Sequence, residues 1–270
     1  MIVDMHTHIY DEEVYQMYMK RASGRVDKIL SIYYWGIIGG GRTERFTFED
    51  MLRFAAKKEN VYVIAAVNTR HDIPMQLKEI EELLKEKKVF GIKMYPGYQH
   101  FEPSDERVFP VADLCVRYNK PLLFHSGTVY DSTGGADLRY AHPIFVDRLA
   151  MRFPKCKIII AHFGFPYFLE TASLVSKNAN VYTEISGTID SVVSESATRD
   201  LLRQYTYDVK RALMYFPEIR GKIMFGTDYG GEDTPLNQID PYIKLVKSVF
   251  SRKEQQHVFA GLAENLFFSS

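Results

Sequence analysis

Two histidines stand one residue apart near the start of the chain, His6 and His8 in the stretch IVDMHTHIY. In a β-strand, side chains at positions i and i+2 point to the same face. Their Cα atoms are then about 6.6 Å apart, so two imidazoles can converge on one metal ion. On a helix they would point in nearly opposite directions. The pair predicts a metal site if this stretch is a strand and other segments supply further ligands.

Further side chains of the same chemistry stand at the ends of later apolar runs, namely His125, His162 and Asp228. Only eight histidines occur in 270 residues. Four of the eight, including His6 and His8, fall at the ends of such runs. Imidazole nitrogens with one carboxylate are the donor set of a zinc-type ion that keeps a position open for water.

The apolar runs recur along the whole chain and are rich in Val, Ile, Tyr and Phe. Several are nearly continuous, which is typical of strands buried on both faces of a parallel sheet. The eight runs occupy residues 2–8, 28–35, 61–67, 89–95, 120–126, 155–162, 180–186 and 222–228.

Segments with helical periodicity surround and separate these runs. Alternation of strands and helices predicts parallel pairing through right-handed crossovers. Eight repeats predict an α/β fold, a closed (β/α)8 TIM barrel that forms a single domain over residues 1–270. The helical segments are residues 11–23, 48–59, 75–88, 104–119 with Ser104 as the N-cap, 142–154, 166–178, 197–217 and 241–256.

A barrel would bring the chemistry-bearing residues together, because barrel enzymes carry their active sites at the C-terminal ends of the strands. The loop after the second run adds three glycines, Gly39, Gly40 and Gly41. Such a loop could cradle a phosphate, but the spacing of the known phosphate-binding motifs is missing. We therefore interpret it as a connecting loop.

Composition narrows the class of protein. Lys plus Arg (34) equals Asp plus Glu (34), which argues against a nucleic-acid partner. No apolar run is long enough for a membrane span. Two isolated cysteines, Cys115 and Cys156, indicate a reducing compartment, and with no visible signal peptide they predict a cytoplasmic protein. A small-molecule substrate is the expected partner, and a homo-oligomer is left open.

The ordered series His-x-His, His, His, Asp resembles the amidohydrolase superfamily, and within it the amidohydrolase-related group of TIM-barrel metal-dependent hydrolases. The matching segments are VDMHTH, GIKMYPGYQ, PLLFHSG, IIIAHFG, VYTEISG and MFGTDYG, in order over residues 3–230. One departure stands near the end, where the family often has GNAxRLF. The chain reads GLAENLF there, with Leu262 in place of the common Asn.

The resemblance implies a role for each of these residues. His6, His8, His125 and Asp228 would hold one divalent metal ion, most simply Zn²⁺, which would make a bound water more acidic. Asp228 would take the proton of that water, and His162 would act as an acid/base or polarise the substrate.

Lys93, in the segment GIKMYP, has two interpretations. Dihydroorotase-like relatives carry a lysine in a similar context that is carboxylated and bridges two metal ions, so a second metal is one alternative. The favoured alternative is an unmodified lysine that pairs with a substrate anion or with Asp228.

Three functions compete. The leading one is a metal-dependent hydrolase that acts on an amide, lactone or ester-like bond of a small molecule. The alternative is a non-oxidative decarboxylase or hydratase of an aromatic-derived carboxylic acid, with Arg70, Tyr95 and Tyr98 as substrate contacts. A non-catalytic barrel is the third, and the complete ligand set argues against it.

Overall fold

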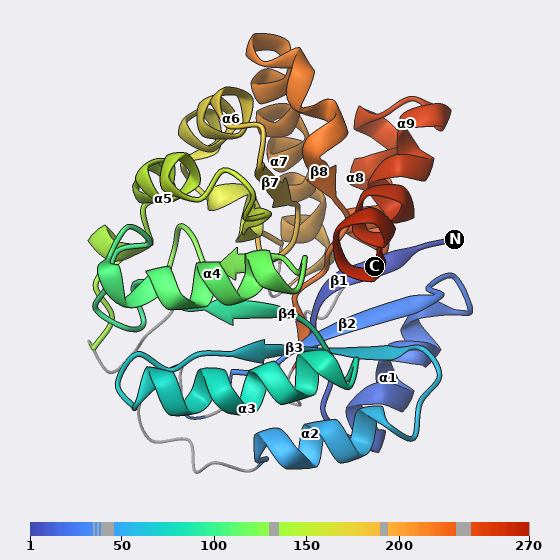
Figure 1. Ribbon diagram of the computed structural model, residues 1–270. Helices are drawn as coiled ribbons and strands as arrows, with labels where there is room; N and C mark the ends of the chain where they lie inside the picture. The colour runs from blue at the N-terminus through green and yellow to red at the C-terminus, as the bar shows by residue number, and fades with distance from the viewer. Residues whose placement is uncertain are drawn as a thin grey trace.

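Nine parallel strands form one curled sheet in the computed structural model of the chain (Figure 1). The structure describes residues 1–34, 36, 38, 46–129, 135–189, 194–230 and 239–269. The strand order is β8-β7-β6-β5-β4-β3-β2-β1-β9. The strands are β1 (Val3–His8), β2 (Lys28–Ile32), β3 (Val61–Ala66), β4 (Val89–Met94), β5 (Leu122–Phe124), β6 (Ile158–Ile160), β7 (Val181–Glu184), β8 (Ile223–Met224) and β9 (Tyr229–Gly230).

All eight predicted runs contain a strand, and neighbouring strands pair in parallel as expected. The last run differs from the expectation. It was predicted to continue to Asp228, but β8 ends at Met224 and a short ninth strand follows. The chain turns between them because Asp228 has a left-handed backbone, with φ 60°.

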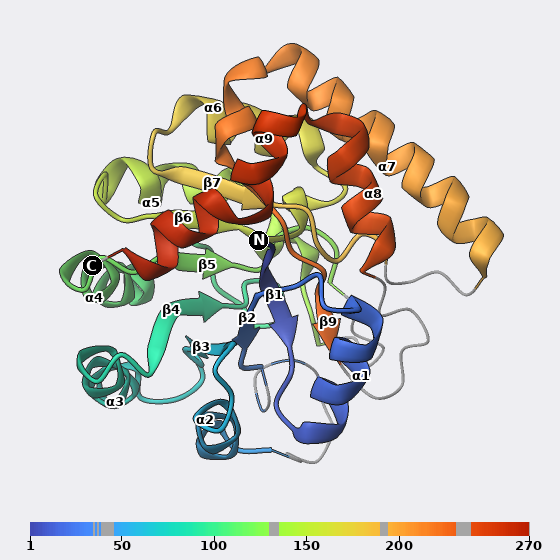
Figure 2. The ribbon, with the colours of Figure 1, turned by 90° about the vertical axis from the view of Figure 1, so that its right-hand side faces the viewer.

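Helices surround the curled sheet on its outer face, as Figure 2 shows. Each predicted helical segment contains a helix, although two begin with a 3₁₀ turn and the last is divided after Phe250. The predicted N-cap Ser104 was wrong: Asp105 caps the 3₁₀ turn that precedes α4. The helices are α1 (Glu12–Ala22), α2 (Phe48–Ala55), α3 (Ile73–Lys85), α4 (Phe109–Arg117), α5 (Val146–Arg152), α6 (Phe168–Lys177), α7 (Glu195–Tyr215), α8 (Asp240–Val249) and α9 (Arg252–Gln256).

β1 is hydrogen-bonded to residues 225–228, the segment between β8 and β9. The backbone N–H of Met5 donates to the Phe225 carbonyl at 3.2 Å, and the N–H of Asp228 donates to the His6 carbonyl at 2.7 Å. β9 then pairs with the end of β1. These hydrogen bonds place the two ends of the chain's strand series side by side.

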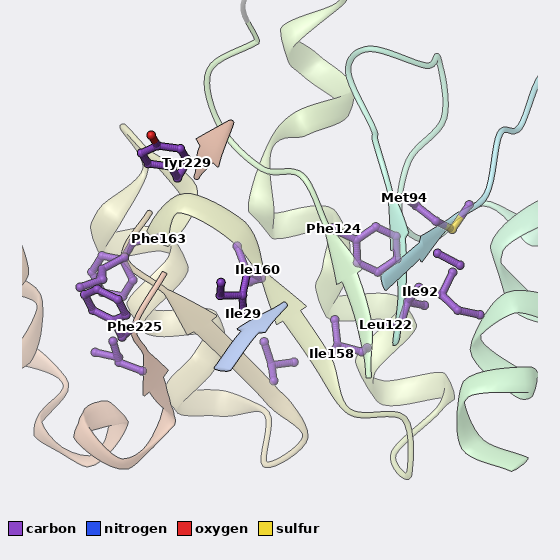
Figure 3. Packing of buried hydrophobic residues seen from close by; sticks show 14 of the residues in the cluster. Ile29, Ile92, Met94, Leu122, Phe124, Ile158, Ile160, Phe163, Phe225 and Tyr229 are labelled. Carbon is purple, nitrogen blue, oxygen red and sulfur yellow. The ribbon is translucent and has the colours of Figure 1, made fainter. Parts of the chain in front are cut away.

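The apolar core has two layers. The outer layer lies between the strands and the helices, and Figure 3 shows part of it, including Ile92, Leu122 and Phe124. The inner layer is enclosed by the sheet. The C-terminal helical turns, residues 257–268, cross one end of the sheet (Figure 2) and insert Leu262, Leu266 and Phe267 into the inner layer.

Three other features noted in the sequence are the two cysteines, the length of the apolar segments and the glycine-rich loop. Cys115 and Cys156 are free and buried. Within the described residues, no helix has the length and apolar character to cross a bilayer. Gly39, Gly40 and Gly41 lie outside the described residues.

We predict that Phe267→Ala lowers the free energy of unfolding by about 3–5 kcal/mol, the usual cost of removing a buried aromatic ring. Phe267 is fully buried in the inner layer. Urea unfolding measures the change. Met214→Ala on α7 is the control, since Met214 is 69% exposed and its loss should change stability by less than about 0.5 kcal/mol. Equal losses in the two variants would contradict the packing described above.

Candidate active site

An irregularity in the pairing of β1 with β2 changes which side chains of β1 point to the inner face of the curled sheet. Strict alternation would put Asp4, His6 and His8 on one face. The pairing of β1 with β2 shifts between Asp4 and Thr7. As a result Met5 faces the inner apolar layer, Asp4 faces outward, and both histidines still line one pocket. Such bulges often re-aim side chains beside active sites.

Hydrogen bonds of the Asp4 side chain connect β1 to the segment that carries Asp228. Its carboxylate is fully buried and accepts hydrogen bonds from the Tyr18 hydroxyl, the Thr227 hydroxyl and the Thr227 N–H, at 2.8, 2.7 and 3.1 Å. Burial raises the pKa of Asp4 to about 7, although the bonds from Thr227 and Tyr18 oppose the shift. Sequence reasoning missed Asp4, although a carboxylate inside an apolar strand was a visible signal.

The donor atoms of His6, His8 and Asp228 converge. Oδ1 of Asp228 lies 3.2 Å from Nε2 of His6 and 3.1 Å from Nε2 of His8. Nδ1 of His8 contacts the Ile32 carbonyl at 2.8 Å, so Nδ1 carries the proton, because a carbonyl can only accept. Nδ1 of His6 likewise donates to Glu184 at 2.9 Å. Nε2 is therefore the nitrogen that each ring directs at Oδ1 of Asp228.

This arrangement fits a bound cation. A metal ligand must be an unprotonated nitrogen, and two such nitrogens beside a carboxylate oxygen repel one another unless a positive charge lies between them. Two ligands of one tetrahedral zinc ion are about 3.4 Å apart, given metal–ligand distances of about 2.1 Å. Histidine ligands also commonly donate their other ring N–H to a carboxylate or a backbone carbonyl, as His6 and His8 do here.

His162 lies in the same cluster. Its backbone has a left-handed conformation, with φ 59°. One ligand atom from each of His6, His162 and Asp228 lies within 4.8 Å of the other two. The ring of His125 lies 5.1 Å from that of His162, between centroids, and Nε2 of His125 donates to the Thr128 carbonyl at 3.0 Å. All five predicted residues line one pocket. In the described part of the chain, the ligand atoms that lie within 4.8 Å of one another include that of His162 but not that of the predicted ligand His125.

Glu184 is the main residue that sequence reasoning missed. It is fully buried at the end of β7. Besides Nδ1 of His6, its Oε1 accepts the backbone N–H of His162 at 2.8 Å and the Ser186 hydroxyl at 2.9 Å. Ser186 in turn lies 3.0 Å from Nδ1 of His162. A lone acidic residue in the apolar run 180–186 was the available signal.

Lys93 lies on the floor of the pocket. The side chain is fully buried, and Nζ has no hydrogen-bond partner among the described residues. Burial lowers the pKa of Lys93 to about 8, although Glu184 and Asp228 oppose the shift. Two carboxylates therefore face one buried ammonium group, which leaves an excess of negative charge for a cation to balance.

Of the three predicted substrate contacts, two line the pocket and one does not. Tyr95 and Tyr98 line the pocket, with a volume of about 70 Å³. The Tyr95 hydroxyl donates to the Tyr33 carbonyl at 2.9 Å. Arg70 is not among the described residues that line the pocket; its guanidinium donates to the Tyr98 carbonyl at 2.7 Å.

Burial sets the protonation states of the ligand group. It lowers the pKa of His6 and of His125 well below the usual value, and it lowers that of His162 to about 4. Burial raises the pKa of Asp228, but the nearby imidazoles of His6, His162 and His8, which attract the carboxylate whenever they are protonated, hold it well below the usual range. Neutral imidazoles and an ionised carboxylate are the forms that bind metal ions.

The chain matches one protein family over nearly its whole length. The model of that family, described as Amidohydrolase, matches residues 3–268. No curated protein matches the sequence.

Solved structures share the fold at low identity. An uncharacterized Tim-barrel protein from Bordetella bronchiseptica is 15% identical with a TM-score of 0.69, covering 98% of this chain and 97% of its own. A probable 2-pyrone-4,6-dicarboxylic acid hydrolase from Acinetobacter baumannii is 15% identical with a TM-score of 0.67, covering 99% of both chains. A 5-carboxyvanillate decarboxylase from Sphingomonas paucimobilis is 16% identical with a TM-score of 0.62, covering 96% and 84%.

We predict that Gly187→Ala lowers the free energy of unfolding by about 1–3 kcal/mol, the scale of local backbone strain. Gly187 has φ 72°, and a Cβ there would lie 2.3 Å from Nδ1 of His162. Chemical denaturation measures the loss. Gly24→Ala is the matched control, because Gly24 has φ 69° and a Cβ there meets nothing within 4 Å. An alanine at 187 that cost no more than the one at 24 would show that His162 is not packed as described.

Proposed function

Because the chain belongs to the amidohydrolase family, whose members typically use a metal, we propose that it is a metal-dependent hydrolase of a small molecule. The scissile bond would be an amide, a lactone or another ester-like bond. The observation that carries the proposal is the convergence of Nε2 of His6 and Nε2 of His8 on Oδ1 of Asp228, at 3.2 and 3.1 Å. A zinc-type ion would supply the acidity that lets water act as a nucleophile near neutral pH.

Each residue then has a distinct task. His6, His8, His125 and Asp228 would hold the metal, and imidazole with carboxylate donors favours zinc. Asp228 receives a proton from the attacking water, since it is ionised and 26% of its side chain is exposed toward the pocket. His162 would act as an acid/base or polarise the substrate, and because burial keeps its ring neutral it can accept a proton.

Lys93 would contact the substrate. A buried ammonium without a hydrogen-bond partner among the described residues is costly, and an anionic group of the substrate would satisfy it. The alternative is a carboxylated Lys93 that bridges a second metal, which requires the neutral amine. A pKa of about 8 leaves a minor neutral fraction at neutral pH, so the unmodified form is favoured.

A second function uses the same residues, namely non-oxidative decarboxylation or hydration of an aromatic-derived carboxylic acid. The buried cation at Lys93 favours it, because a substrate carboxylate would be drawn to that point. Tyr95 and Tyr98 offer aromatic rings for such a substrate. Arg70 would act as a clamp only after releasing the Tyr98 carbonyl.

The proposal extends to the architecture. The hydrogen bonds between β1 and residues 225–228 support a closed (β/α)8 barrel that forms a single domain over residues 1–270. Two free, buried cysteines are consistent with a cytoplasmic location. A homo-oligomer remains part of the hypothesis, to be examined by light scattering.

We predict that protein purified without chelator carries close to one zinc-type ion per chain. His6→Ala with His8→Ala should remove that ion and leave the fold intact, since both rings point into the pocket. Elemental analysis measures the metal, and circular dichroism checks the fold. His71→Ala, at an exposed histidine outside the site, is the control. A double variant that binds metal as tightly as the natural chain would refute the assignment.

We predict that a screen of lactones, amides and aromatic carboxylic acids finds a substrate whose turnover depends on Asp228 and His162. Asp228→Asn should lower kcat about 10²-fold or more and weaken metal binding. His162→Asn should lower kcat about 10²- to 10⁴-fold, the size of acid/base effects, with metal content near normal. The product distinguishes hydrolysis from decarboxylation.

If His162→Asn loses metal in parallel with activity, His162 is a ligand rather than an acid/base. Its place within 4.8 Å of the His6 and Asp228 ligand atoms makes this comparison decisive.

A further inference from the structure

Glu184 contacts both histidines to which the proposed function gives different tasks. One oxygen, Oε1, accepts three hydrogen bonds: from Nδ1 of His6, from the backbone N–H of His162 and from the Ser186 hydroxyl. The other, Oε2, accepts the backbone N–H of Ser186 at 2.6 Å. The side chain is fully buried, so these four donors, rather than water, satisfy it.

Each oxygen of this carboxyl group accepts a backbone N–H, Oε1 from His162 and Oε2 from Ser186. These donors do not depend on a tautomer, and they give the side chain the acceptor role of a carboxylate. Nδ1 of His6 must then carry a proton, which leaves the lone pair on Nε2, the atom that faces Asp228. Glu184 thus selects the His6 tautomer that can bind a metal ion.

Ser186 connects Glu184 to the ring of His162 through hydrogen bonds. Its hydroxyl donates to Glu184, so its oxygen serves as an acceptor, 3.0 Å from Nδ1 of His162 and 3.2 Å from Nδ1 of His6. A proton on Nδ1 of His162 leaves the lone pair of its neutral ring on Nε2. The His162 backbone N–H bond to Glu184 also holds the left-handed turn that presents the ring.

We propose that Glu184 is a positioning residue that sets the tautomers of His6 and His162 together, directly for one ring and through Ser186 for the other. This inference rests on the proposed metal role of His6 and acid/base role of His162. One buried carboxylate therefore serves the metal site and the proton-transfer group at the same time. A glutamine cannot replace it, because its amide NH₂ would face N–H donors at either oxygen position, or would force His6 to move its proton to Nε2.

The test compares Glu184→Gln, Ser186→Ala and Thr183→Val. Long-range ¹H–¹⁵N spectra of the metal-free protein report which ring nitrogen of each histidine is protonated. Zinc affinity is measured separately, by competition with a chromophoric chelator. Thr183→Val is the matched control, because it removes a buried hydrogen bond from the same strand, to the Ile160 carbonyl, without contacting either histidine.

In the natural chain we expect His6 and His162 both protonated at Nδ1. Glu184→Gln should shift His6 toward the Nε2–H form and weaken zinc binding about 10- to 100-fold. Ser186→Ala should release the His162 tautomer while zinc affinity falls less than about 10-fold. Thr183→Val should lower stability and leave both tautomers and the zinc affinity unchanged.

Natural tautomers and zinc affinity in folded Glu184→Gln would overturn the inference. If that variant does not fold, Ser186→Ala decides it: a His162 ring still held at Nδ1–H without the hydroxyl would overturn the relay. A natural chain that binds no zinc would instead overturn the proposed function, and the tautomers of the metal-free protein would still judge Glu184.

Discussion

The hydrogen bond from the Asp228 N–H to the His6 carbonyl is the contact on which the site depends. It joins residues far apart in the chain and holds the Asp228 carboxylate opposite the rings of His6 and His8. The buried Asp4 carboxylate strengthens the junction by accepting both polar hydrogens of Thr227. Without this junction the donor atoms would belong to separate edges of an open sheet.

The site carries backbone strain at two of its residues. His162 and Asp228 both adopt left-handed conformations, which cost an L-residue of order 1–3 kcal/mol each. Each is held by a hydrogen bond from its own N–H, to Glu184 in one case and to His6 in the other. Because these acceptors are themselves buried, the fold can hold the two side chains in orientations that a relaxed backbone would not present.

Stability and chemistry occupy opposite ends of the sheet. The C-terminal helical turns contact residues at the strand starts, where Lys28 pairs with Glu264 and Lys120 donates to the Phe267 carbonyl. Leu262, the departure from the family's usual Asn, lies in the apolar inner layer there and needs no polar partner. The pocket opens at the other end, where His125 and Asp228 follow their strands.

Much of this was determined by the sequence alone. Continuous apolar runs specify buried parallel strands, because only burial on both faces tolerates them, and residues at their ends must gather at one edge. That reasoning located His6, His8, His125, His162, Asp228 and Lys93, and the resemblance to the amidohydrolase family was confirmed.

The tertiary structure alone decided the rest. The register shift in β1, the early end of β8 and the roles of Asp4 and Glu184 arise from contacts between segments distant in the chain, which local periodicity does not encode. A carboxylate within an apolar strand breaks the pattern of that strand, and the sequence does not say why. Its role depends on which hydrogen-bond donors the folded chain brings near it, and only packing in three dimensions determines that.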